Sequence, residues 1–483
     1  MLRGLGVKPT LPIISLTVAT ALGLFAASRG AANRVFTSYA SVKPILTELR
    51  SDAQRERLPA ELRNADEATW LAWARRNDKA IRARLQQGEL DSMVNFLLYG
   101  TSFTRQPRIS MEGDGITKAS KAGVLGARVD DLVAGLRNPG DNERLIFLQQ
   151  LLRSQRIDPG TSKDPKQIGV FILQNLLRVA QERKTLAERA ADAQHATDAK
   201  SPAQPDDPSS LLDRSSLFRD RGLSLDTGIF PDFSIEQTLR DLKERGVLRE
   251  GQVARVAVIG PGLDFIDKNE ESAYDYYPQQ TLQPFALYDS LVRLRLAKAN
   301  AVTMSIFDIS STVIEHVQRA RERAKKNIGY VIQLPRGAAL PSPPELIGYW
   351  KSLGDQVGTA IAPISPPRVF KGLETRAVLI RPEVVLACEP IDLDIVLERL
   401  NLAAVDHFDL MVATNIFVYY HTFEQSLALE NAGAMLKPGG LLLTNDRLPA
   451  VPGSSIRLAG VTVVPYDFPG VSTRQAVGWY RKQ

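Results

Sequence analysis

The sequence contains only one cysteine, Cys388, among its 483 residues. A lone cysteine cannot form a disulfide within the chain, and it cannot supply a cluster of thiolate ligands for a metal. Histidine is scarce as well, since the chain has four, and no two of them show the short spacing that is typical of zinc ligands. These shortages argue against a disulfide-stabilised fold and against a zinc site of the common kinds.

Several familiar catalytic motifs are also missing. The chain has no phosphate-binding loop, no Ser-His-Asp arrangement and no paired-carboxylate motif. Its net charge of +6 arises from interleaved acids and bases rather than from a block of one sign. The sequence therefore gives no support for a hydrolase or a kinase, and it carries no specific signal for nucleic-acid binding.

Residues 1–34 have the features of a signal peptide or membrane anchor. Arg3 and Lys8 precede an uncharged and largely apolar run at residues 11–27, which small residues follow. The run is short compared with the roughly 20 residues of a comfortable membrane span, so a cleaved signal and an uncleaved anchor both stay open. We expect the protein to be exported or membrane-associated, with membrane contact through residues 11–27.

A change in composition divides the rest of the chain. Residues 35–196 carry apolar side chains three and four positions apart, which predicts a mainly α-helical domain. Residues 197–217 are rich in proline, aspartate and serine, which is typical of a linker. From residue 218 to residue 483, strand and helix patterns alternate. The sequence therefore predicts a helical domain, a linker and an α/β domain.

The α/β part is expected to form a Rossmann-like, doubly wound, seven-stranded sheet, because alternating strands and helices favour a mostly parallel sheet with helices on both faces. The predicted strands are residues 256–259, 302–307, 384–387, 408–413, 441–444, 461–464 and 476–480.

Two features at the ends of these strands point to a ligand site. The first strand runs into Gly260, Pro261 and Gly262, and glycines at such a turn let a ligand approach the backbone closely. The second strand ends at Asp308, whose carboxylate can accept two hydrogen bonds from a vicinal diol. Each feature alone also fits a plain turn or a helix N-cap. Together, in this order along a chain of alternating strands and helices, the two features favour a nucleotide-like ligand.

The order of these motifs resembles the class I methyltransferases that use S-adenosylmethionine. The resemblance covers roughly residues 218–483 and includes Lys437-Pro-Gly-Gly440 before the fifth strand, while residues 413–420 are similar to chemotaxis-receptor methyltransferases. It implies a methyltransferase with S-adenosylmethionine as cofactor and an unidentified acceptor, either a small molecule or a protein. The glycine turn would hold the methionine part, Asp308 the ribose, and the segment after the third strand the adenine.

The resemblance also implies which residues form the site. The implied cofactor-binding residues are Gly260, Pro261, Gly262, Asp264, Asp308, Ile309, Ile391, Asp392 and Thr414. The implied catalytic residues, which would orient or surround the acceptor, are Asn415, Tyr419 and Tyr420. No residue stands out as a base, and methyl transfer depends chiefly on aligning the acceptor with an already reactive methyl group.

The sequence departs from the family at two points, and one of them is a proline-rich excursion at residues 334–376. After Gly262 it has Asp264 instead of a further glycine, and a long acidic and aromatic loop, residues 265–283, precedes the next helix. This loop is expected to be a lid over the cofactor, a substrate loop or a plain surface loop, and an altered or lost cofactor pocket stays open as well.

Two other functions stay open. One is a nicotinamide-dependent oxidoreductase, although its usual acid lies about 20 residues after the glycines, and Asp308 is much further away. The other is a catalytically silent envelope or scaffold protein, because an exported domain would meet little of a cytosolic cofactor.

Overall fold

The computed structural model describes residues 34–50, 58–111, 113–160, 165–199, 228–265, 274–337, 343–368, 370–451, 453–468 and 471–483. The predicted signal or anchor segment lies outside these ranges except for Arg34, so membrane contact through residues 11–27 stays a prediction. Within the described ranges, no helix combines the length and the apolar character that crossing a membrane requires.

A seven-stranded sheet forms the centre of the C-terminal half, with the strands in the order β11-β12-β10-β9-β2-β3-β7. The five strands from β10 to β7 run parallel to one another, whereas β12 and β11 form an antiparallel pair at the other edge. The predicted seven-stranded, doubly wound sheet is therefore confirmed. Its strands are β2 (Arg255–Ile259), β3 (Thr303–Asp308), β7 (Cys388–Asp392), β9 (Phe408–Ala413), β10 (Leu436–Thr444), β11 (Ile456–Phe468) and β12 (Val471–Lys482).

The strand order reverses direction next to β2. From β2 the chain passes to β3 and then to β7 on one side, and it returns to β9 and β10 on the other side. In open α/β sheets ligands bind outside the carboxyl ends of the strands at such a reversal. We therefore expect a ligand site at the carboxyl ends of β2, β3 and β9.

The two faces of the sheet belong to two separate apolar cores. One core joins α9 and α10 to Val256 and Val258 of β2, and the other joins α14 to Ala257 and Ile259 of the same strand. Successive side chains of a strand point to opposite faces of the sheet, so this alternation shows that β2 is buried on both faces. The helices that surround the sheet are α9 (Ile229–Glu244), α10 (Gln283–Arg293), α11 (Ser311–Lys325), α13 (Pro382–Ala387) and α14 (Thr422–Met435).

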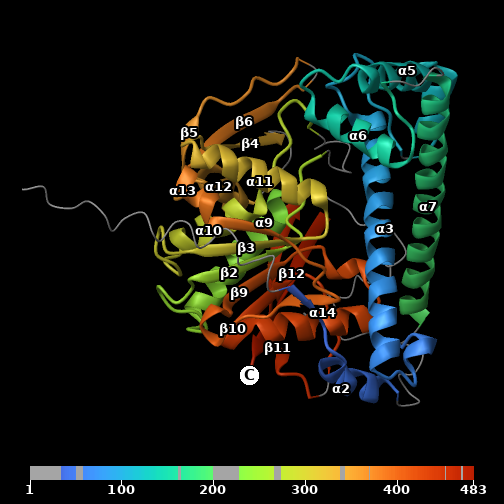
Figure 1. The fold of residues 1–483 in the computed structure, drawn as a ribbon. Helices are drawn as coiled ribbons and strands as arrows, with labels where there is room; N and C mark the ends of the chain where they lie inside the picture. Colours follow the sequence, from blue (N-terminus) through green and yellow to red (C-terminus); the bar gives the residue numbers. More distant parts are fainter. Residues whose placement is uncertain are drawn as a thin grey trace, which may run out of the picture.

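The N-terminal part consists mainly of helices, and Figure 1 shows α3 and α7 standing side by side along one flank of the α/β part. Its first strand, β1, pairs with β8 far along the chain, where Arg34 lies opposite Leu400. The elements are β1 (Arg34–Phe36), α2 (Tyr39–Leu49), α3 (Glu67–Tyr99), α4 (Gly115–Lys121), α5 (Val124–Arg137), α6 (Glu143–Ser154) and α7 (Pro165–Ala199), with β8 (Glu398–Leu400) in the C-terminal half.

One apolar core runs through both halves of the protein. Trp70 and Trp73 of α3 pack their rings against Phe423 of α14, with ring centroids 6.5 and 5.4 Å away. The Trp70 indole also donates a hydrogen bond to the carbonyl of Thr37, and the Thr37 hydroxyl contacts Asn431. The helical half therefore packs against α14, which is one of the helices that cover the sheet. The division into domains at residues 197–217 stays a prediction, because residues 200–217 lie outside the described ranges.

One predicted strand is wrong. Residues 384–387 form the end of α13, and the third strand of the sheet is the following segment, β7. The β-branched pair Val384 and Val385 favours a strand, but Pro382 lies in the first helical turn, where its fixed φ suits a helix. Both valines are buried, so either structure would account for their apolar character.

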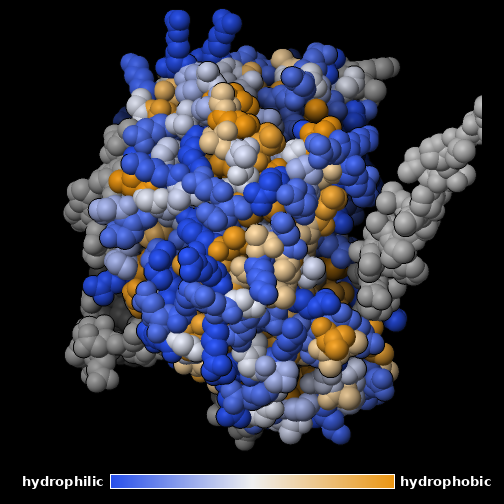
Figure 2. Space-filling model, turned by 90° about the vertical axis from the view of Figure 1, so that its left-hand side faces the viewer, coloured by the Kyte–Doolittle hydropathy of each residue, from blue (hydrophilic) through white to orange (hydrophobic). Residues whose placement is uncertain are grey.

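The proline-rich excursion between α11 and α13 contains a second sheet that the sequence does not predict. It has three antiparallel strands in the order β4-β6-β5. Figure 2 shows the face of the molecule to which this excursion belongs, and the coloured residues there form small apolar patches separated by polar side chains. The elements are β4 (Tyr330–Gly337), α12 (Pro344–Ser352), β5 (Gly358–Ile361) and β6 (Leu373–Ile380).

Limited proteolysis tests the predicted linker and the shared core together. We expect the first cuts within residues 200–217, where proline, aspartate and serine dominate. Because one core joins the halves, the two fragments should then co-elute in gel filtration and separate only in denaturant. First cuts elsewhere would contradict the linker, and fragments that separate without denaturant would contradict a stabilising shared core.

Candidate functional site

The turn after β2 is shaped by two glycines in the left-handed region. Gly260 has φ +62° and Gly262 has φ +69°, values that side chains with a Cβ rarely adopt. The Gly260 amide donates to the carbonyl of Phe307 at 2.8 Å, which ties the turn to the end of β3. A Cβ at Gly260 would lie 2.1 Å from the Cδ1 atom of Ile416. A side chain at Gly260 would therefore require Ile416 to move.

Asp308 is the last residue of β3 and is only 7% exposed. One carboxylate oxygen accepts a hydrogen bond from the Ser310 amide at 2.8 Å. Burial raises the pKa of this carboxyl to about 7, although the backbone amides of Ser310, Gly262 and Ile309 work against the increase. Asp308 is therefore poised between its neutral and its charged form near neutral pH.

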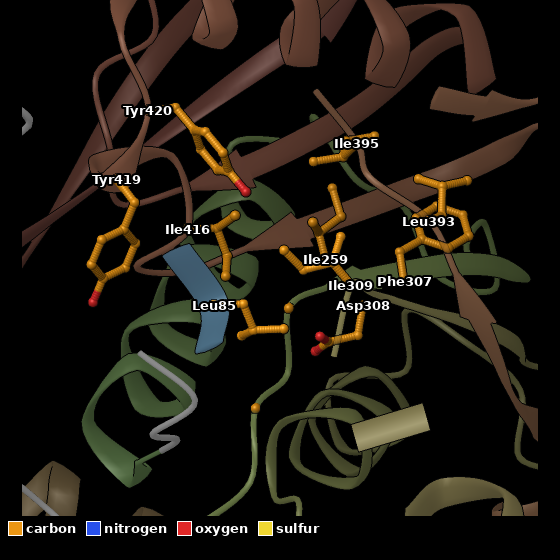
Figure 3. Close-up of a pocket in the computed structure, with 12 residues that line it drawn as sticks. Leu85, Ile259, Phe307, Asp308, Ile309, Leu393, Ile395, Ile416, Tyr419 and Tyr420 are labelled. Carbon is orange, nitrogen blue, oxygen red and sulfur yellow. The ribbon is translucent and has the colours of Figure 1, made fainter. Parts of the chain in front are cut away.

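A small cavity of about 50 Å³ lies between the glycine turn, Asp308 and the N-terminal helix α3. Figure 3 shows its lining side chains. Most of the lining is apolar, with Asp308 as its one charged residue. The lining residues are Leu85, Ile259, Gly260, Gly262, Phe307, Asp308, Ile309, Leu393, Ile395, Ile416, Tyr419 and Tyr420.

Two of the predicted catalytic residues border this cavity, and they point in different directions. Figure 3 shows the Tyr420 ring turned toward the other lining side chains, whereas the Tyr419 hydroxyl points away from them. Burial and the nearby carboxylates of Asp394 and Glu424 raise the pKa of the Tyr420 hydroxyl. Tyr420 is therefore held as a neutral phenol, which can donate a hydrogen bond but is not a ready base.

Asn415, the third predicted catalytic residue, does not line the cavity. It is exposed and has φ +57°, which is uncommon for a residue other than glycine. Its backbone amide and its side-chain carbonyl both bind the side chain of Asn445, each at 2.8 Å. This pair of bonds fixes the orientation of the Asn415 amide at the end of β9.

Of the predicted cofactor-binding residues, Gly260, Gly262, Asp308 and Ile309 line the cavity, whereas five others do not. Pro261 and Ile391 are buried beside it, and the Thr414 hydroxyl accepts a hydrogen bond from Gln283 at 2.6 Å. Asp392 forms ion pairs with Arg34 and Arg82. Asp264 accepts a hydrogen bond from the Tyr277 hydroxyl at 2.5 Å.

The described part of the loop that follows the glycine turn packs against the helical half. The Asp275 carboxylate accepts hydrogen bonds from the backbone amides of Thr101 and Ser102, both at 2.8 Å. Tyr276 packs against Phe370, and the Tyr277 hydroxyl binds Asp264. None of these described loop residues lines the cavity. The lid hypothesis thus has no support from residues 274–283, and residues 266–273 lie outside the described ranges.

Six lining residues were not predicted from the sequence, namely Leu85, Ile259, Phe307, Leu393, Ile395 and Ile416. Ile259 and Phe307 directly precede predicted site residues at strand ends, so their position along the strand could have indicated them. Leu393 is brought to the site by its amide, which donates to the carbonyl of Asp308 at 3.1 Å. Leu85 comes from α3, and nothing in its local sequence points to a ligand.

The lining residues fit the chemistry of S-adenosylmethionine. Asp308 can accept hydrogen bonds from the two ribose hydroxyls, and the aliphatic side chains of Ile309 and Leu393 offer apolar walls for an adenine ring. The Tyr420 ring could face a sulfonium through cation–π attraction. Among the residues that the structure describes, no group of three or more histidine, cysteine and acidic side chains could hold a metal.

No protein-family model and no curated protein sequence matches the chain. Solved structures do match it. The chain is similar in fold to S-adenosylmethionine-dependent methyltransferases. ChlM of Synechocystis, magnesium protoporphyrin IX methyltransferase with bound cofactor, is 10% identical over 52% of this chain and 78% of its own, with a TM-score of 0.24. A TehB-like enzyme of Corynebacterium glutamicum is 12% identical over 52% and 98%, with a TM-score of 0.23.

A further match is TrmN of Thermus thermophilus. It is 11% identical, with a TM-score of 0.24, over 53% of this chain. The matched region spans about half of TrmN, 52% of its length. Similarity at this level concerns the fold alone, and the activity depends on the residues of the site.

Proposed function

We propose that this protein is an S-adenosylmethionine-dependent methyltransferase. The observation that supports it best is the placement of Asp308, which lies in the cavity wall together with the glycine turn that ends the neighbouring strand β2. A glycine turn and a diol-binding acid on adjacent parallel strands, at the reversal of the strand order, suit a nucleoside with a charged tail. The N-terminal helix encloses this arrangement from the other side.

Each part of the site has a role in the proposed reaction. When bound, S-adenosylmethionine supplies an activated methyl group, so the protein mainly needs to hold and align the reactants. Asp308 and the glycine turn would bind the cofactor, and the buried aliphatic walls would exclude water from it. Asn415 has its amide fixed by Asn445 at the end of β9, where it would orient the acceptor.

Calorimetric titration of the purified protein with S-adenosylhomocysteine tests this proposal. The product is the better probe because it occupies the same site and cannot react. We expect one binding site per chain and an increase in the thermal unfolding midpoint, because a ligand that binds only the folded state stabilises it. Absence of both effects would overturn the proposal and leave a protein that has the fold without the cofactor.

A further inference from the structure

A groove opens beside the cavity, between helices α3, α6 and α11. It has a volume of about 550 Å³ and shares two lining residues, Leu85 and Ile309, with the cavity. The two spaces therefore meet along these side chains. One wall of the groove is α3, which supplies Lys79, Arg82, Ala83, Leu85, Gln86 and Glu89.

Glu89 brings a second carboxyl group to this junction. It lies four residues after Leu85, and side chains at this spacing share one face of a helix. Burial raises its pKa to about 7, and the charge of Asp308 contributes to the increase. Glu89 forms no hydrogen bond or ion pair with any residue that the structure describes. Glu89 is partly buried, so its carboxyl group has limited access to solvent, and a ligand that donates a hydrogen bond would give it a partner.

Helix α3 is held at this position by bonds to both sides of the cavity. Arg82 donates to the carbonyl of Ile309 at 3.1 Å and to the Asp392 carboxylate at 3.0 Å. Arg84 donates to the carbonyl of Tyr419 and lies over the ring of Tyr420. The helix is thus fixed to the segment after β3 and to the tyrosines that follow β9. Its distance from Asp308 is therefore set by the fold.

We propose that α3 completes the cofactor site, and that Glu89 accepts a hydrogen bond from the ribose of S-adenosylmethionine opposite Asp308. This inference rests on the proposed function. A vicinal diol carries two hydroxyl donors, and two carboxylates on opposite sides can each accept one. Leu85, on the same face of the helix, packs on the adenosine. The helical half then acts as the second wall of the site.

The charged groups around the pair set its pH dependence. Asp308 is also influenced by Asp392, whose charge raises the pKa of Asp308, and Asp392 is paired with Arg34 and Arg82. The remaining charged side chains of the groove are Lys79 on α3 and Glu315 on α11. Since the pKa of Glu89 is about 7, the side chain is mostly protonated at pH 6 and mostly ionised at pH 8. Only the ionised Glu89 carboxylate can offer the ribose a charged hydrogen-bond acceptor.

The test is a calorimetric titration of full-length wild type and Glu89→Gln with S-adenosylhomocysteine at pH 6 and pH 8. At pH 8 we expect the variant to bind about tenfold more weakly, because one charge-assisted hydrogen bond is lost. At pH 6 the two proteins should bind almost equally, since Glu89 is already neutral there. The matched control is Glu315→Gln, an exposed carboxylate of the same groove that should match wild type at both pH values.

The possible outcomes separate the two proposals. A wild-type protein that binds nothing overturns the proposed function, and this inference with it. If wild type binds but Glu89→Gln behaves like Glu315→Gln, or shows the same deficit at both pH values, only the role of Glu89 is overturned. Hydrogen exchange of wild-type α3 provides a second measurement that needs no variant. Added S-adenosylhomocysteine should slow exchange at residues 82–89, and unchanged exchange there would overturn the inference.

Discussion

Replacing Asp308 with alanine is expected to weaken binding of S-adenosylhomocysteine by about 1.5–3 kcal/mol, the usual loss for a hydrogen bond to a charged group. This corresponds to a loss in affinity of roughly 10- to 150-fold. The effect should be largest above pH 7, because the carboxyl group has a pKa of about 7 and accepts best when ionised. Calorimetry at pH 8 measures it directly.

Asp409→Ala is a suitable control for this experiment. Asp409 also accepts backbone hydrogen bonds in the same sheet, from Ala254 and Arg255, each at 2.8 Å. It sits at the amino end of the strands, however, far from the cavity. Both variants lose a carboxylate that caps backbone amides, so both should be less stable. Only Asp308→Ala should lose affinity, and equal binding by the two variants would contradict the assigned role of Asp308.

The parts of the site that the sequence predicted are those that follow directly from one strand and its turn. Gly260 and Gly262 end a short apolar run, and Asp308 ends the next one. Parallel strands bring their carboxyl ends to one edge of a sheet, so these residues had to meet if the strands were correctly identified. The structure places all three in the cavity wall.

The contribution of α3 could not be predicted in this way. Leu85 and Glu89 belong to an ordinary amphipathic stretch, and their place in the site depends on contacts such as that of Arg82 with Ile309, 227 positions further along the chain. No local pattern records such a contact. The wrong strand at residues 384–387 has a different cause. Its β-branched residues are buried in the helix and would also be buried in a strand, and their local pattern alone favoured the strand.

Arg144 is expected to be one of the most important residues for the stability of the protein, although it lies outside the cavity. It is 2% exposed, and its guanidinium donates to the carbonyls of Phe265 and Tyr277, with a longer contact of 3.5 Å to that of Asp264. These carbonyls belong to the two ends of the loop that follows the glycine turn. A single side chain of α6 therefore fastens both ends of this loop to the helical half.

Arg144→Met keeps most of the side-chain bulk and removes every donor, so it leaves at least two buried carbonyls without a partner. At about 1–3 kcal/mol for each, the free energy of unfolding should fall by about 2–6 kcal/mol. The control is Arg153→Ala on the same helix. Arg153 is 49% exposed and pairs with Asp158, so its loss should cost no more than about 0.5 kcal/mol.

Urea denaturation of both variants measures the difference in stability, and hydrogen exchange locates it. In Arg144→Met the amides of Asp264 and Gln279 should exchange faster, because the bonds that they form, to Gln280 and Glu143, depend on the position of the loop ends. Arg144→Lys should recover little of the loss, since one ammonium group cannot reproduce the planar fork that reaches separate carbonyls. An Arg144→Met variant as stable as Arg153→Ala would contradict this role of the guanidinium. The loop would then be attached to the helical half by the packing of Asp275 and the tyrosines instead.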